Sequence, residues 1–159
     1  MRKTCLVWAA ILVLILGLPL YAGAYSGKVV AVLDGDTIEV LQRGKADRVR
    51  LQGIDCPEKG QAFGNKAKQF TAAMVMGKEV TVKTAGCDKY GRTLGTVLLP
   101  DGRNLNRELV RAGLAWWYRH YSADRSLGDL EAEARDAHRG LWQNPHPIPP
   151  WEYRREKSN

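Results

Sequence analysis

Apolar and polar residues alternate in five short segments of the chain, which is the pattern of half-buried β-strands. Turn-forming residues such as Asp34-Gly35-Asp36 separate neighbouring segments. In the third segment Arg48 and Arg50 alternate with apolar residues, so both arginines are expected on one face of the strand. The strands are predicted at residues 29–33, 37–41, 48–53, 79–83 and 93–99.

Three other segments carry apolar residues at steps of three and four, which predicts α-helices. The first helix is expected to end at Gly77, the second at Gly113 and the third at Gly140, with Ser126 as the N-cap of the third. The periodic positions are Ala67, Phe70, Thr71 and Met74, then Leu105, Leu109 and Ala112, then Leu127, Leu130, Ala134, Ala137 and Leu141.

The order of these elements predicts the fold class. The connections between the first three strands are too short for the crossovers of a parallel sheet. Five short strands with one helix between the third and the fourth predict a mainly β fold with helices, namely a five-stranded barrel of the oligonucleotide-binding (OB) type with three α-helices.

The hydropathy pattern divides the chain into three parts. Residues 1–24 have a basic start, an uncharged apolar run and a small-residue site at Ala22-Gly23-Ala24, as in a secretory signal peptide cut after Ala24. An uncleaved membrane anchor formed by residues 4–24 is the alternative. Residues 25–143 form the predicted barrel domain, and residues 144–159 are expected to be a Pro-rich, basic surface tail.

Composition and charge narrow the class of protein. The 159 residues are 45% hydrophobic and 26% charged, which argues against a disordered chain, a collagen-like repeat or a coiled coil. The formal net charge of +7 favours phosphate-rich or acidic partners. After export, Cys56 and Cys87 would be the remaining cysteines, and a disulfide between them is permitted but not established by their spacing.

Four carboxylates are candidates for a metal site. Asp34 and Asp36 flank a turn, and Asp55 and Glu58 follow the third strand. If the barrel brings these strand ends together, their oxygen ligands suit Ca²⁺ or Mg²⁺ rather than zinc. The alternative is that the first pair forms only a turn and the second only a loop.

Two arginines complete a candidate catalytic set. Arg50 lies five residues before Asp55, and Arg92 follows a polar turn that enters the fifth strand. Guanidinium groups can bind the charge that develops on a phosphodiester under attack. The alternative is that both arginines are solvated or form structural salt bridges on an exposed strand face.

Residues 32–37, 50–58 and 88–92 resemble the three signature stretches of the staphylococcal nuclease-like family, the thermonucleases. Residues 106–115 and 134–142 resemble the same family, so the resemblance extends from about residue 28 to residue 142. All three signature stretches occur in the family's order, which makes the resemblance specific.

The resemblance implies roles for individual residues. Asp36, Asp55 and the backbone carbonyl of Cys56 would bind Ca²⁺. Glu58 would activate or position the attacking water. The phosphate-binding arginines of the family match Arg50 and, in the third stretch, Arg92.

The resemblance also implies contacts with the rest of the substrate. Lys89 and Tyr90 would contact a neighbouring phosphate. An ungapped match places Tyr121 on one base-stacking position and Arg119 on the other, and a small shift would place Tyr118 there instead. Tyr118 and Tyr121 are therefore the candidate stacking residues.

These expectations favour an exported, calcium-dependent nuclease that cuts DNA with little sequence specificity and leaves 3′-phosphate ends. RNA is an open alternative as a substrate. A non-catalytic nucleic-acid-binding OB module is the main alternative, and an envelope-associated structural protein is a third class. We expect a monomer located in the periplasm or outside the cell, with no obligate protein partner. Membrane association is expected only if the N-terminal segment is retained.

Overall fold

The computed structural model describes residues 23–158, in which five strands close into a barrel with the order β1-β2-β3-β6-β5. This confirms the predicted mainly β class with a five-stranded OB-type barrel. Four strand pairs are antiparallel, and the parallel pair β3–β6 completes the closure. The barrel strands are β1 (Ala24–Asp34), β2 (Thr37–Gln42), β3 (Lys45–Leu51), β5 (Glu79–Cys87) and β6 (Thr93–Leu98).

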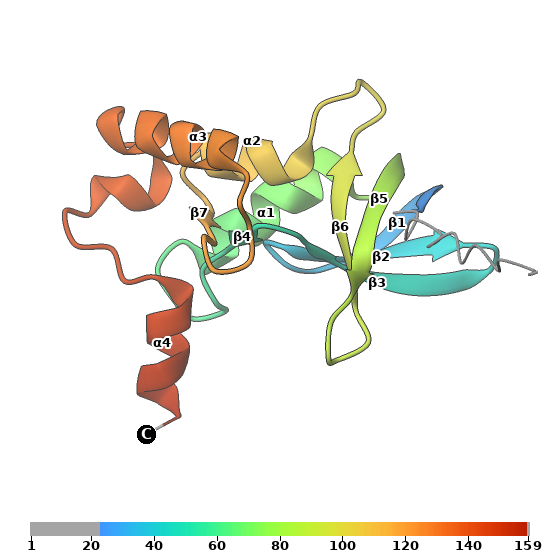
Figure 1. Cartoon of the computed structure of the whole chain (residues 1–159), viewed down its shortest axis with the longest axis horizontal. Coiled ribbons are helices and arrows are strands. Elements are labelled where there is room, and N and C mark those ends of the chain that lie inside the picture. The colour runs from blue at the N-terminus through green and yellow to red at the C-terminus, as the bar shows by residue number, and fades with distance from the viewer. Residues whose placement is uncertain (1–22, 159) are drawn as a thin grey trace, which may run out of the picture.

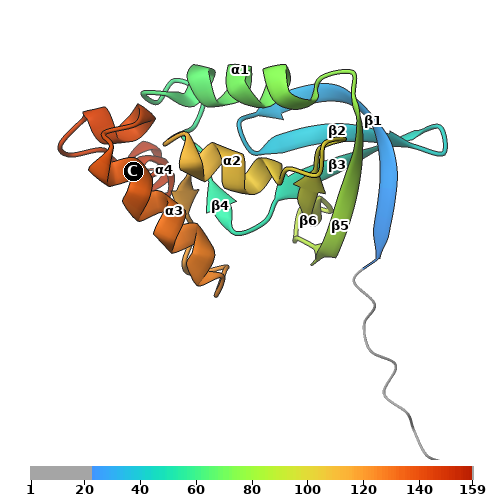
Figure 2. The same ribbon diagram turned by 90° about the horizontal axis from the view of Figure 1, so that it is seen from above.

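The helices gather beside one end of the barrel (Figures 1 and 2). A two-stranded ladder of β4 (Ile54–Asp55) and β7 (Trp116–Trp117) lies among them. The helical elements are α1 (Gly64–Val75), α2 (Leu105–Arg111), α3 (Arg125–Asp136), the 3₁₀ helix η1 (Gly140–Gln143) and α4 (Pro150–Lys157). None of the helices formed within residues 23–158 is long and apolar enough to cross a membrane.

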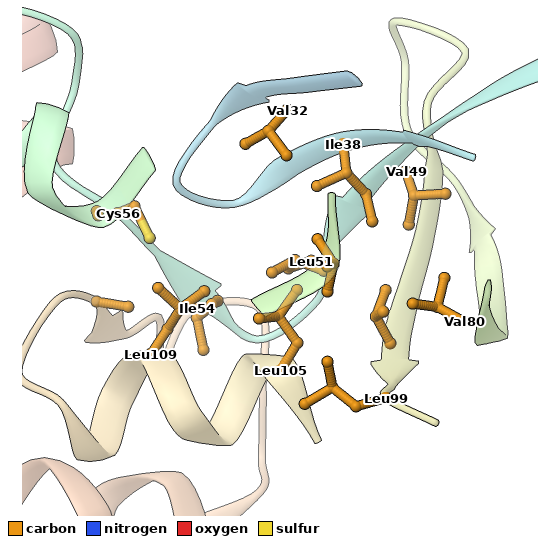
Figure 3. Close-up of a cluster of buried hydrophobic side chains, with 14 of the residues drawn as sticks. Val32, Ile38, Val49, Leu51, Ile54, Cys56, Val80, Leu99, Leu105 and Leu109 are labelled. Carbon is orange, nitrogen blue, oxygen red and sulfur yellow. The ribbon is translucent and has the colours of Figure 1, made fainter. Parts of the chain in front are cut away.

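Strand alternation builds the core and leaves one charged row outside it. Val49 and Leu51 of β3 point into the core, whereas Arg48 and Arg50 lie on the other face, as the period of two predicts. Figure 3 shows the side chain of Leu105 meeting the barrel residues from α2. This packing joins α2 to the barrel.

Two glycines allow α2 to approach the chain that follows α3. A Cβ atom on Gly113 would lie 2.2 Å from the carbonyl oxygen of Arg139, and one on Gly140 would lie 2.2 Å from that of Gly113. Both glycines have positive φ, 68° and 53°, a region that favours glycine. The amide of Leu141 donates to the Gly113 carbonyl at 2.8 Å, so the two segments are in direct backbone contact.

The third predicted helix is shorter than expected. It ends at Asp136 rather than at Gly140, because His138 has a φ of 50° and Arg139 is extended. Leu141 is still buried, but from η1. The N-cap is Asp124, whose carboxylate accepts a hydrogen bond from the amide of the predicted cap, Ser126.

The C-terminal segment differs most from the prediction. Three α-helices were expected with residues 144–159 as a tail, but the described residues include a fourth, α4. Pro150 stands at the first helical position, where its fixed φ suits a helix and its missing N–H costs nothing. Glu152 in the first turn and Arg154, Arg155 and Lys157 in the last complement the helix dipole. The predicted signal peptide or anchor lies almost entirely outside the described residues, although Ala24 already belongs to β1.

One buried amide links the barrel to α2, which gives a test of the fold. Asn106 accepts a hydrogen bond from the Val97 amide at 3.2 Å and donates to the carbonyls of Gln52 at 2.9 Å and Gly95 at 3.2 Å. Asn106→Ala leaves these buried groups unpaired and is expected to lower the free energy of unfolding by about 2–3 kcal/mol. Urea denaturation measures this loss. The exposed Gln143→Ala is the control, and equal stability of the two variants would contradict the structural role of Asn106.

Candidate active site

Two segments far apart in the sequence bring Asp36 and Asp55 to the same buried place. Asp36 is the last residue of the turn between β1 and β2, and Asp55 ends β4. The amide of Cys56 donates a hydrogen bond to Asp36 Oδ2 at 2.7 Å. The amide of Leu51 donates to the Asp36 carbonyl at 2.8 Å. These bonds fix the two acidic segments beside each other.

Arg50 joins the two carboxylates. Its Nη2 atom lies 3.2 Å from Asp36 Oδ2 and 2.8 Å from Asp55 Oδ1. Its Nη1 atom donates to the carbonyls of Leu51 at 2.8 Å and Ile54 at 3.0 Å. The Arg50 side chain is 13% exposed and that of Asp55 is 1% exposed. Arg50 is therefore the buried counter-ion of this pair, held by four acceptors that suit its planar donor geometry.

The turn after β3 creates this arrangement. Gly53 has a φ of 78°, which reverses the chain so that β4 leaves the barrel. Ile54 then pairs with Trp117, and Asp55 with Trp116. The carboxylate of Asp55 is thereby turned back toward Arg50 on the preceding strand.

Burial and like charges shape the electrostatics of the site. Burial raises the pKa of Asp55, and the neighbouring arginines offset only part of that rise. Burial, followed by the charges of Asp36 and Glu58, raises the pKa of Asp34. The ionised carboxylates therefore repel one another, and an added cation would relieve that repulsion.

A second arginine reaches the site from the C-terminal helix, and sequence reasoning missed it. Arg154 Nη2 lies 2.8 Å from Asp55 Oδ2, and its Nη1 donates to Glu58 Oε1. The Pro at the first position of α4 and its basic last turn were available signals for a helix. No spacing in the sequence links Arg154 to Asp55, which lies 99 residues earlier.

Three of the predicted phosphate contacts, Lys89, Tyr90 and Arg92, lie in the hairpin between β5 and β6. Arg92 Nε donates to Asp88 Oδ2 at 2.7 Å, and Asp88 Oδ1 accepts from the amides of Tyr90 and Arg92 at 2.9 and 3.0 Å. The charged groups of Lys89 and Arg92 lie 5.1 and 5.6 Å from the centre of the Tyr90 ring. Within the described residues, the salt-bridge partner of Arg92 is Asp88, not the Asp36–Asp55 cluster.

The candidate stacking residues form an aromatic group beside the acidic cluster. The rings of Tyr118 and Tyr121 meet edge to face with centroids 4.8 Å apart. Burial, followed by the charge of Asp55, raises the pKa of Tyr118, which is consistent with its place near the acidic cluster. Arg119 instead lies over Trp117, with 4.8 Å between its Cζ atom and the ring centroid. The geometry thus groups Tyr118, not Arg119, with Tyr121.

The disulfide left open by the sequence is not formed. Cys56 and Cys87 are both free thiols; Cys56 is buried and Cys87 is exposed. Burial, and then the charge of Asp36, raises the pKa of Cys56 well above its ordinary value. Cys56 contributes to the site through its backbone, since its amide binds Asp36.

The donor chemistry of the cluster fits a hard divalent cation. The cluster holds four carboxylates, Asp34, Asp36, Asp55 and Glu58, but only two arginines, which contact the last three of them, and its potential metal ligands are all oxygens. Residues 23–158 contain no group of three or more His, Cys, Asp and Glu side chains arranged to hold a metal ion. A cation bound here would therefore need backbone, water or substrate oxygens in addition to the carboxylates.

Comparison with known proteins identifies the family. The model of the staphylococcal nuclease homologue family matches residues 48–144. An uncharacterized endonuclease of Escherichia coli O157:H7 is 48% identical over 139 residues, which cover 87% of this chain and 91% of the relative. Protein ParB of Escherichia coli is 45% identical, with 95% and 90% covered, and a micrococcal nuclease of Shigella flexneri is 44% identical, with 95% and 92% covered.

The fold and the site define a class of protein: an OB-type barrel that carries an acidic pair bridged by an arginine. The chain belongs to the staphylococcal nuclease homologue family, as its three signature stretches predicted.

Arg50 can be tested as the buried counter-ion. Arg50→Met would leave Asp36 and Asp55 buried with less compensation, so the free energy of unfolding is expected to fall by about 3–5 kcal/mol at neutral pH. The loss should shrink as the pH falls, because removing the Arg50 charge further raises the pKa of Asp55 and protonation then removes the uncompensated charge. Chemical denaturation at several pH values measures both effects.

Arg48→Met is the matched control for this prediction. Arg48 lies two residues earlier on β3, and its salt bridge to Glu39 is 3.0 Å long with the arginine side chain 55% exposed. Such a pair contributes about 0–1 kcal/mol. Similar destabilisation by the two variants would refute the counter-ion role of Arg50.

Proposed function

We propose that the protein is an exported, calcium-dependent nuclease that hydrolyses phosphodiester bonds of DNA with little sequence specificity and leaves 3′-phosphate ends. The observation that carries the proposal is the cluster of Asp36, Arg50 and Asp55, with Glu58 at its edge. Relatives named endonuclease and micrococcal nuclease, matched over about nine tenths of their length, support a nuclease activity. RNA is a second candidate substrate.

Each residue of the cluster has a proposed task. Asp36, Asp55 and the backbone carbonyl of Cys56 would hold the cation, and calcium, when bound, supplies positive charge that polarises the phosphate. Glu58 accepts a proton from the attacking water. The water oxygen bonds to phosphorus while the bond to the 5′-oxygen breaks, and the leaving oxygen takes a proton from solvent. Arg50 stabilises the charge that develops on the phosphate.

The remaining contacts are proposed to hold the nucleic-acid strand. Arg92 would exchange its bond to Asp88 for one to the phosphate, and Lys89 and Tyr90 would contact the next phosphate from the same hairpin. Tyr118 and Tyr121 would stack on bases. Phosphate contacts and stacking discriminate weakly between bases, which accounts for the low sequence specificity proposed here.

Export is proposed from the N-terminal sequence. The basic start, the uncharged apolar run and the Ala-Gly-Ala site support a signal peptide over residues 1–24. The alternative, an anchor formed by residues 4–24, would leave the same domain attached to a membrane. In either case the nuclease would act outside the cytoplasm.

Chelation tests the cation. The purified domain is expected to cut single-stranded DNA in the presence of Ca²⁺, to stop when EGTA is added and to resume when Ca²⁺ is restored, because the cation compensates the charge of the carboxylate cluster. Gel electrophoresis with end-labelled DNA measures the rate and identifies the ends. Undiminished cleavage in EGTA would contradict the proposed cation, and DNA that is bound but uncut would indicate the non-catalytic module.

Glu58 can be tested separately from the fold. Glu58→Gln removes the proton acceptor while keeping the size of the side chain, so kcat is expected to fall by about 100- to 10,000-fold. Glu39→Gln, which affects a carboxylate on β2 paired with Arg48, should leave kcat close to that of the wild type. Normal turnover of the Glu58 variant at saturating DNA would show that another group accepts the proton.

A further inference from the structure

The C-terminal helix α4 lies on the candidate active site through a charged contact. Arg154 binds Asp55 with both of its terminal nitrogens, at 2.8 Å to Oδ2 and 3.4 Å to Oδ1, and it also donates to Glu58. Partial burial opposes the charged form of Arg154, but the bonds to these carboxylates outweigh it and raise the pKa of the guanidinium. Arg154 therefore stays positively charged and is the counter-ion of Asp55, the proposed cation ligand, and of Glu58, the proposed base.

Neutral contacts hold the same segment in register. Trp151 stacks on Tyr118 with ring centroids 5.1 Å apart and an interplanar angle of 5°. Gln61, in the loop after Glu58, donates to the carbonyl of Ile148 at 2.7 Å. One ring face of a proposed base-stacking residue is therefore covered by the segment that also carries Arg154. A nucleobase that stacks on this face of Tyr118 would have to displace Trp151.

Two properties of Asp55 make Arg154 and a cation competitors: its acceptor positions are nearly filled, and its present partners are positively charged. A carboxylate offers about four acceptor positions, and those of Asp55 already take three hydrogen bonds, one from Arg50 and two from Arg154. A divalent cation at Asp55 would also lie close to both positive charges, and like charges repel.

Of the two arginines, Arg154 is the one that can leave. Arg50 is anchored by the carbonyls of Leu51 and Ile54, and its side chain is 13% exposed. Arg154 is carried by a helix at the end of the described chain, its side chain is 43% exposed, and α4 lies at the outer edge of the molecule (Figure 1). Displacing Arg154 therefore disturbs α4 and its contacts with Tyr118 and Gln61, whereas displacing Arg50 would disturb the barrel.

We propose that Arg154 competes with the divalent cation for Asp55 and Glu58, so that α4 is docked on the cation-free site and released when the cation binds. The inference rests on the proposed function, because it requires a cation at this cluster. Linkage makes the effect reciprocal: the cation weakens the docking of α4, and the docking of α4 weakens the binding of the cation by the same factor. Docked α4 consequently lowers the affinity of the site for the cation, and with it the proposed nuclease activity, until the cation displaces the helix.

Calorimetric titration with Ca²⁺ in the absence of DNA tests this competition. Arg154→Gln is expected to lower the Kd for Ca²⁺ by roughly 5- to 100-fold relative to the wild type, the usual range of coupling between linked sites. Arg155→Gln is the matched control, because it removes the same charge from the next residue of the same exposed helix and should leave the Kd unchanged. Far-UV circular dichroism and urea unfolding establish that the variants are folded.

Hydrogen exchange of residues 150–157 supplies a second readout. In the wild type, Ca²⁺ should accelerate exchange in α4, and in Arg154→Gln exchange should already be fast without Ca²⁺. If Arg154→Gln binds Ca²⁺ no more tightly than the wild type, or if Arg155→Gln gains as much affinity, the proposed competition is refuted while the proposed function stands. If neither the wild type nor Arg154→Gln binds Ca²⁺, the proposed cation fails and this inference fails with it.

Discussion

The ion-pair network around Asp55 is the interaction on which the rest of the site depends. A carboxylate that is 1% exposed needs compensation, and Asp55 obtains it from Arg50 on one side and Arg154 on the other. Arg50 in turn is fixed by two backbone carbonyls and by Asp36. The barrel therefore supplies a rigid half of the network, because these partners come from β3, from β4 and from the turn that joins β1 to β2.

The other half of the network comes from the end of the chain. α4 carries one charged residue to the acidic cluster and one aromatic residue to Tyr118. The barrel half contains the groups proposed for catalysis, and the helical half covers them. The barrel part of the site is therefore fixed, whereas the position of α4 depends on the charge at the acidic cluster.

The sequence predicted the elements whose signal is local. Alternation located the barrel strands, and Gly77 and Gly113 marked helix ends because both adopt positive φ. The signals that failed were also local. Gly140 was taken as the stop of a helix that had already ended at Asp136, because nothing in the pattern revealed the left-handed conformation of His138.

The sequence could not predict contacts that depend on the complete fold. Motif order led to the expectation that Asp36 and Asp55 are neighbours, but the sharing of one guanidinium by both carboxylates depends on the turn at Gly53. Arg154 was interpreted as part of a solvated tail, since basic termini usually are. Arg92, by contrast, takes a local partner, Asp88, which lies four residues earlier in the same hairpin. Long-range ion pairs leave no periodic trace in a sequence.

A crystal structure of the purified protein grown with Ca²⁺ tests most directly whether the carboxylates joined by Arg50 form one cation site. The expected result is an ion about 2.3–2.6 Å from oxygen atoms of both Asp36 and Asp55. An ion bound elsewhere, with both carboxylates still engaged only by arginine, would contradict this account.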